Sequence, residues 1–211
     1  KDCSLIIESL PDIEFSRCIA KIYVRGLSKI HKMEGMMMCE NIRLVKPTLE
    51  LEKEALEYRQ EHFDCGELVI NGSELFDKIV SYKEWLEKVT ANASPETVDP
   101  NWVLTDAFFA VRVSDNKIVG IADLRYQLND FLKDFGHCGY SVRPTERRKG
   151  YAAEILRQIC FAAGRHDLKQ LQLSVEKDNA ASIKTIEKNG GKYCRSFTFE
   201  NEEAYVYLIN L

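Results

Sequence analysis

Three consecutive cations stand beside a glycine in the C-terminal half of the chain, and this stretch is the best suited to hold an anion. Residues 147–149 are Arg-Arg-Lys, and Gly150 joins them to an amphipathic helix pattern. The first N–H groups of a helix lack partners inside the helix and lie at the positive end of its dipole. The spacing therefore predicts a phosphate-binding turn at Gly150, with a solvated basic turn as the alternative.

Two other phosphate-binding patterns do not fit the residues around Gly150. A dinucleotide-binding turn needs three glycines on the first strand-helix unit, whereas this turn has a single glycine late in the chain. A P-loop needs lysine and then serine or threonine after its glycine, whereas Tyr151 and Ala152 follow here. Both of these nucleotide-binding classes are set aside.

The turn at Gly150 and a later helix start together resemble the GNAT superfamily of acyl-CoA N-acyltransferases. Arg-x-x-Gly-x-Ala after Val-x-Pro is similar to that family's pyrophosphate loop, and Asn-x-x-Ser at Asn179 is similar to its helix beside the pantetheine arm. Taken alone, Asn179 is also explained as an N-cap. The cofactor-binding residues that the resemblance implies are Val142, Arg143, Arg147, Arg148, Lys149, Gly150, Tyr151, Ala152, Asn179 and Ser182.

The resemblance implies transfer of an acetyl group from acetyl-CoA to a primary amine, by direct attack in a ternary complex and without a metal. Pantetheine is then expected to lie beside the strand that ends at Val142 and to pair with the backbone of Tyr140 and Val142. A backbone N–H of this strand would stabilise the oxyanion. The segment Gly136 to Pro144 also resembles a loosely characterised bacterial subgroup, which indicates no substrate.

Amine attack requires a base, because most amines are ammonium ions at pH 7. His137, at the head of the strand expected to line the site, is the first candidate base, and Tyr140 and Glu176 are further candidates. A structural role for this histidine stays open. Ile186 stands where the family commonly carries a tyrosine that acts as general acid. A catalytically inactive acyl-CoA binding or sensor module therefore remains the alternative function.

Strand and helix signals alternate along the chain and position these residues. They predict the α/β (α+β) fold class, and the resemblance implies a GNAT-like mixed, mostly antiparallel central sheet with flanking helices. The strands at 137–143 and 170–175, joined by a helix, are expected to be parallel, and the resemblance implies that they splay apart. The other expected strands are 41–47, 105–114, 117–126, 192–199 and 203–211, and the expected helices are 51–62, 76–89, 150–164 and 179–189.

Length and composition favour one domain with a sizeable core, since the chain has 211 residues of which 45% are hydrophobic. The predicted domain is 41–211. Residues 1–40 are interpreted as an N-terminal extension whose status the sequence leaves open, because the Met-Met-Met at 36–38 precedes the first strand signal and resembles a translation start.

Charge and cysteine usage narrow the partners. A net charge of −4 argues against nucleic acid, and no apolar run approaches the roughly 20 residues of a membrane span. Seven scattered cysteines without a CxxC pair indicate a reducing, cytoplasmic location. Residues 40–102 contain fourteen acidic and seven basic side chains, so an acidic rim is expected to attract a cationic acceptor amine, small molecule or peptide. A homodimer is left open.

Overall fold

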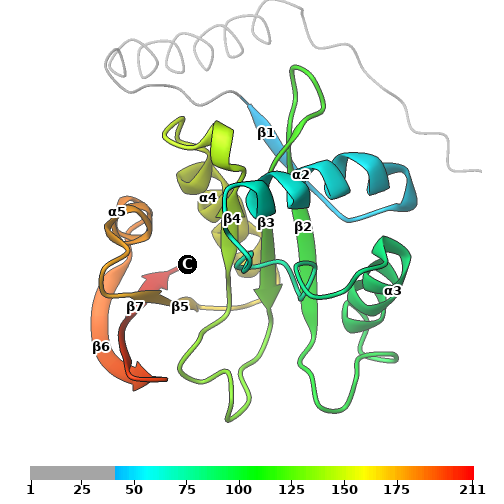
Figure 1. Cartoon of the computed structure of the whole chain (residues 1–211). Coiled ribbons are helices and arrows are strands. Elements are labelled where there is room, and N and C mark those ends of the chain that lie inside the picture. Colours follow the sequence, from blue (N-terminus) through cyan, green and yellow to red (C-terminus); the bar gives the residue numbers. More distant parts are fainter. Residues whose placement is uncertain (1–40) are drawn as a thin grey trace, which may run out of the picture. The chain divides into compact units, whose positions relative to one another are not determined.

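The structure is a computed structural model that describes residues 41–211, so the extension predicted for residues 1–40 lies outside the described residues. Two antiparallel sheets form its centre, with strand orders β1-β2-β3-β4 and β5-β7-β6 (Figure 1). The strands are β1 (Ile42–Val45), β2 (Thr105–Arg112), β3 (Ile118–Arg125), β4 (Tyr140–Val142), β5 (Gln170–Glu176), β6 (Lys192–Phe199) and β7 (Glu202–Asn210). The α-helices are α2 (Glu52–Asp64), α3 (Tyr82–Asn92), α4 (Tyr151–Arg165) and α5 (Ala180–Lys188), with short 3-10 turns η1 (Leu49–Leu51) and η2 (Pro144–Glu146).

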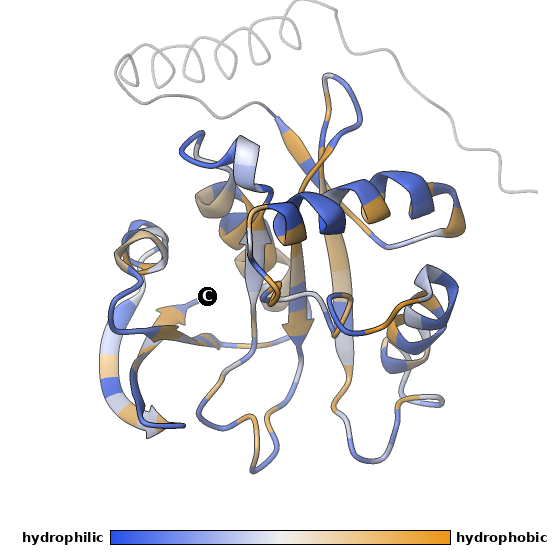
Figure 2. Ribbon diagram, viewed as in Figure 1, coloured by the Kyte–Doolittle hydropathy of each residue, from blue (hydrophilic) through white to orange (hydrophobic). Residues whose placement is uncertain are grey.

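The first sheet is covered by helices on both faces, α2 and α3 on one and α4 on the other (Figure 1). Phe109 and Ile121 belong to a buried cluster with Trp85 of α3, whereas Ala122 shares a second cluster with Ile155 of α4. Figure 2 shows the result, because β2 and β3 are largely hydrophobic while α2 alternates between hydrophilic and hydrophobic residues. A strand buried on both faces needs apolar residues at nearly every position.

The second sheet joins the first near the start of β5 and then separates from it. An isolated bridge pairs Gly136 with Leu173, and the N–H of His137 donates to the carbonyl oxygen of Gln172 at 2.8 Å. Each ladder between the described strands is antiparallel, and β4 and β5 lie in different sheets. The two strands that were predicted to splay, β4 and β5, therefore separate without a hydrogen-bond ladder between them.

Two predicted elements begin too early. The strand expected over 137–143 is confined to Tyr140–Val142. The helix expected over 76–89 begins only at Tyr82, because Ser81 is its N-cap and accepts a hydrogen bond from the N–H of Glu84 at 3.3 Å. The residues before it form turns in which Glu74 and Leu75 have positive φ, a conformation that no α-helix contains. Apolar spacing alone did not reveal this interruption.

The helix after the cationic turn also differs slightly from its prediction. It passes through Gly164 and ends at Arg165, and Asp167 rather than the glycine adopts the left-handed conformation, with φ of 64°.

The final hairpin is confirmed. Glu200 and Asn201 both have positive φ there, as a type I′ connection requires.

Between residues 41 and 211, no helix combines the length and the apolar character needed to cross a membrane.

Replacement of Ile121 by alanine should lower the free energy of unfolding by about 2–5 kcal/mol, because its fully buried side chain fills the space between β3 and the helices. Urea titration followed by circular dichroism measures this change. Val113→Ala is the control, since that side chain is 52% exposed, and it should stay within about 0.5 kcal/mol of the parent. Equal effects of the two changes would contradict this description of the core.

Candidate active site

A cavity of about 1700 Å³ opens where the two sheets separate. Its walls include β4, the end of β5, and the first turns of both α4 and α5. The loop of residues 66–78 and Trp102 line it as well. Small-molecule sites commonly have about 300–1,000 Å³, so this cavity can hold a cofactor arm together with a second substrate.

The edge of β4 that faces away from β3 has unpaired backbone groups. The carbonyl oxygen of Gly139 accepts from Asp123, and the N–H of Arg143 donates to Val119, so alternate residues of this segment bond to β3. The N–H groups of Tyr140 and Val142, between them, therefore point to the cavity. This is the strand edge that the predicted pairing with pantetheine needs.

The turn before α4 has the backbone expected of an anion site. Gly150 is the N-cap with φ of 88°, which a residue with a side chain rarely adopts, and Arg148 is also left-handed with φ of 65°. The first helical N–H groups, from Tyr151 to Ala153, line the cavity and have no partner among the described residues. Arg148 also lines the cavity, and its side chain has no ion-pair partner within residues 41–211.

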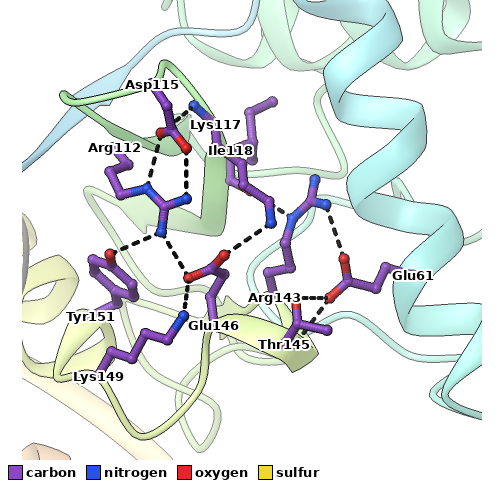
Figure 3. Close-up of polar contacts among 10 residues, drawn as sticks. All are labelled: Glu61, Arg112, Asp115, Lys117, Ile118, Arg143, Thr145, Glu146, Lys149 and Tyr151. Atoms are coloured by element: carbon purple, nitrogen blue, oxygen red, sulfur yellow. Dashed lines mark hydrogen bonds and ion pairs between the residues drawn. The ribbon is translucent and has the colours of Figure 1, made fainter.

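A buried carboxylate fixes the base of this turn. Glu146, 4% exposed, accepts from Arg112 at 2.8 Å, Lys117 at 2.9 Å and Lys149 at 2.7 Å (Figure 3). Burial by itself raises the pKa of Glu146, but the hydrogen bonds from Lys149 and Lys117 and the charges nearby outweigh it and lower the pKa to about 2. Tyr151 is 2% exposed, and its hydroxyl accepts from Arg112 at 3.3 Å.

Two predicted phosphate ligands are engaged elsewhere. Arg143 is buried, donating from Nε to the carbonyl oxygen of Ile118 at 2.8 Å and pairing with Glu61 of α2 at 2.9 Å (Figure 3). Lys149 pairs with Glu146, and neither cation lines the cavity. Their charges hold the loop to the body of the protein, so the structure does not bring these side chains to the anion site.

Arg147 lines the cavity but already has a carboxylate partner. Its guanidinium forms a two-pronged pair with Glu67 at 2.5 and 2.6 Å. The Glu67 carboxylate also lies 2.8 Å from Nδ1 of the buried His62 ring. Of the predicted loop ligands, Arg148 and the backbone of residues 150–152 are therefore the groups left available to an anion.

The start of α5 lies across the cavity from β4. Asn179 caps the helix by accepting from the N–H of Ser182 at 3.0 Å. The Ser182 hydroxyl lies 2.8 Å from the hydroxyl of Tyr140, so this contact connects the two sides of the gap. Burial raises the pKa of Tyr140 to about 12, which keeps its phenol protonated. Ile186, at the usual tyrosine position, is 1% exposed and packs in the core.

His137 lies outside the cavity lining, in contrast to its predicted role as base. Its Nδ1 accepts from the backbone N–H of Gln172 at 3.0 Å. A neutral imidazole that accepts at Nδ1 carries its hydrogen on Nε2, so neither nitrogen has a free lone pair. Burial and the charge of Arg125 also lower the pKa of His137. The structural role left open by the sequence fits this geometry. Glu176 does line the cavity, at the exposed end of β5.

A buried group of charges at the other end of the cavity was missed by sequence reasoning. Asp123, fully buried on β3, accepts from the N–H of Gly139 at 2.5 Å and pairs with Arg125. Arg125 also pairs with Glu74 at 3.4 Å. Burial first, and then the negative charge of Asp123, raise the pKa of Glu74 above the ordinary glutamate range. A carboxylate within an apolar strand is the signal that could have revealed it.

The sequence matches the model of one protein family over residues 73–192, which is more than half of the chain, and that family is the acetyltransferase (GNAT) domain. The chain belongs to the GNAT acetyltransferase family, which confirms the family and the N-acetyltransferase class predicted from the two motifs. No curated protein matches the sequence.

Solved structures show the same fold at low sequence identity. The microcin C7 self-immunity acetyltransferase MccE, solved with acetyl-CoA and AMP, is 15% identical over 83% of this chain and 94% of that chain, with a TM-score of 0.62. Spermidine N-acetyltransferase SpeG from Vibrio cholerae, in a mutant form, is 12% identical over 81% and 94%, with a TM-score of 0.56. The GNAT domain of S. lividans PAT is 13% identical over 81% and 89%, with a TM-score of 0.54. The predicted fold class is confirmed.

Replacement of Glu146 by glutamine should destabilise the protein by about 3 kcal/mol at pH 7, because three cations lose a buried anionic partner. A carboxyl whose folded pKa is lowered stabilises the fold above its unfolded pKa of about 4.3 and loses that contribution as the pH falls toward 2. Chemical denaturation at several pH values measures both effects. Glu202→Gln, an exposed change of the same type, should alter neither; a stability loss as large in Glu202→Gln would contradict the assignment.

Proposed function

We propose that this protein transfers an acetyl group from acetyl-CoA to a primary amine by direct attack in a ternary complex. One observation carries the proposal. A single cavity connects an unpaired helix N-terminus, the free edge of β4 and a buried pair of carboxyl groups. These are an anion site, a strand-like docking edge and a site for proton removal, in that order along the cavity.

The cofactor end is assigned to the start of α4. The pyrophosphate of CoA would accept hydrogen bonds from the backbone N–H groups after Gly150, with Arg148 as its free cation. The pantetheine arm would follow β4 and pair with the backbone of Tyr140 and Val142, beside the capped start of α5 at Asn179. In this proposal the pantetheine arm follows this path without breaking the buried ion pairs of Arg143 and Glu146.

The reacting thioester would then lie near the head of β4. A backbone N–H of this strand points at the position where negative charge develops on the carbonyl oxygen. Tyr140 is suited to donate a proton to the leaving thiolate, since its phenol stays protonated and touches Ser182 one turn before Ile186. In this proposal Tyr140 serves as the general acid that Ile186 cannot supply, rather than as a base.

The acceptor end favours a cation, although fewer acidic groups are free than the sequence suggested. Glu61 and Glu67 of the acidic segment are paired with Arg143 and Arg147. Glu74 faces the cavity together with exposed apolar side chains, and Glu176 lies on its β5 wall. We therefore propose a primary ammonium on a body that is partly apolar. The apolar side chains at this end are Leu68, Val69, Leu75, Trp102, Phe131 and Phe199.

A cytoplasmic location is retained as part of the proposal. The four cysteines between residues 41 and 211 are free thiols, which a reducing compartment preserves.

CoA should stabilise the protein, because a ligand that binds only the folded state contributes roughly 2.7 kcal/mol at a hundredfold excess over its Kd. Arg148→Glu should remove most of the rise in Tm by placing a negative charge at the phosphate site. Differential scanning fluorimetry with millimolar CoA measures the shift. Arg165→Glu reverses a charge at the opposite end of the same helix and should keep the response. A parent protein whose Tm does not move with CoA lacks the proposed phosphate site.

Cationic amines should be acetylated in preference to anionic amino acids of similar size, and the preference should weaken as salt screens the carboxylates. CoA thiol release with a panel of amines at low and high ionic strength measures this selectivity. Faster turnover of the anionic acceptors at low salt would overturn the acceptor assignment. Binding of CoA without thiol release for any amine would instead favour the inactive acyl-CoA-binding alternative.

A further inference from the structure

The carboxyl cluster at the acceptor end contains two carboxyl groups and one guanidinium group. Arg125 is the guanidinium that both Asp123 and Glu74 contact. Side-chain exposures are 0% for Asp123, 4% for Glu74 and 16% for Arg125, so solvent screens these charges little. With both acids ionised, one negative charge has no partner within the cluster. A cation that enters the cavity would supply that partner.

The loop that carries Glu74 is held in a strained conformation. Glu74 and Leu75 have φ of 50° and 66°, values that a residue with a side chain rarely adopts. The buried indole of Trp85 donates to the carbonyl oxygens of Ser73 and Glu74 at 2.9 and 3.1 Å. These two hydrogen bonds keep the backbone of the turn in place.

A close contact between two glycines brings this loop to the reacting end of β4. A Cβ on Gly72 would lie 2.3 Å from the carbonyl oxygen of Gly139, so neither backbone could approach with a side chain at residue 72. The N–H of Gly139 in turn donates to Asp123. Glu74 is therefore fixed beside the start of β4, where the thioester is expected.

We propose that Glu74 binds the ammonium group of the acceptor and accepts its proton. This inference rests on the proposed acetyl transfer and names the base for it. Trp102 completes the site, because its Nε1 donates to Oε2 of Glu74 at 2.9 Å while its ring, 38% exposed, borders the cavity. One carboxylate oxygen is thus oriented, and the apolar ring would cover the carbon body next to the ammonium.

The proton balance of the step is complete without a further reactant. The ammonium gives its first proton to the Glu74 carboxylate, and the neutral amine forms the C–N bond at the thioester carbon. The C–S bond then breaks, Tyr140 protonates the leaving thiolate to give the free thiol, and the second amine proton restores the Tyr140 phenol. Glu74 returns its proton to solvent, so the products are an amide, CoA and one proton.

The groups around Glu74 suit a base that works near neutral pH. Its carboxyl group faces Asp123 and Arg125 from β3 and the indole N–H of Trp102, whereas the indole N–H of Trp85 bonds to the backbone carbonyl oxygen of Glu74. Cys138 is a buried thiol beside the same charges. Burial and the charge of Asp123 raise the pKa of Glu74, whereas Arg125 and Trp102 lower it. A carboxylate with a raised pKa takes a proton from an ammonium more readily than an ordinary glutamate does.

Glu74→Gln is the first test, with Glu202→Gln as the matched control at the rim of the same cavity. Glu74→Gln should lower kcat/KM for a cationic amine by about 10²-fold or more, while the rise in Tm with CoA stays. The control should keep its activity. Near-parent turnover by Glu74→Gln, with the parent pH profile, would overturn the proposal.

The pH profile of the parent distinguishes an enzyme group from the substrate. Log kcat/KM should rise with pH through a midpoint well above the roughly 4.3 of an ordinary glutamate, and this midpoint should be common to amines of different pKa. Trp102→Phe removes a hydrogen bond that favours the ionised form, so the midpoint should move to higher pH. No movement in Trp102→Phe contradicts the proposal, even if Glu74→Gln does not fold.

A binding measurement separates this proposal from the proposed function. In protein labelled with carboxyl-13C glutamate, the Glu74 resonance, assigned with Glu74→Gln, should titrate well above the ordinary range. Benzylammonium, without acetyl-CoA, should lower that midpoint. An ordinary midpoint that the amine leaves unmoved overturns the site. A lowered midpoint in a protein that acetylates none of the amines supports the ammonium site and contradicts the transferase function alone.

Discussion

The cavity depends on a hydrogen bond between the two sheets, from the backbone N–H of Gln172 to Nδ1 of His137. In a regular ladder this N–H would donate to a carbonyl oxygen, and the two sheets would continue as one. Here an imidazole takes that position next to the bridge at Gly136 and Leu173, and β4 and β5 separate beyond it. The strand edge at Tyr140 therefore stays free for a ligand that behaves as a strand.

The separation exposes a cationic turn whose shape is set by carboxylates of the protein itself. Glu146 pairs with three cations at the base of the turn. Glu61 and Glu67, from the N-terminal half of the chain, pair with Arg143 and Arg147. These pairs link the acidic segment to the basic one, so Arg143 and Arg147 neutralise two of the fourteen acidic side chains of residues 40–102. The positive potential that remains available to a ligand comes from Arg148 and from the N-terminus of α4.

Local patterns predict most of this fold, because alternation, caps and turns depend on neighbouring residues. Apart from the strand expected over 137–143, which is confined to Tyr140–Val142, the strands and three of the helices fall close to their expected ranges. The start of α3 is missed because Phe76 continues an apolar spacing that Ser81 interrupts as a cap. The carboxyl site is missed for a different reason. The burial of Glu74 depends on Arg125 and Trp102, which are distant in the sequence and meet it only in the folded chain.

The carboxyl cluster is also the part of the structure that folding alone explains least. Two buried acids beside one guanidinium destabilise the folded state relative to an apolar packing of similar volume, and the left-handed turn at Glu74 adds strain. Nearby residues nevertheless hold this arrangement firmly, through the indole of Trp85 and the close contact at Gly72. Under the role proposed for Glu74, this rigid pair of carboxyl groups beside a free strand edge is preorganised to bind the ammonium group of an acceptor.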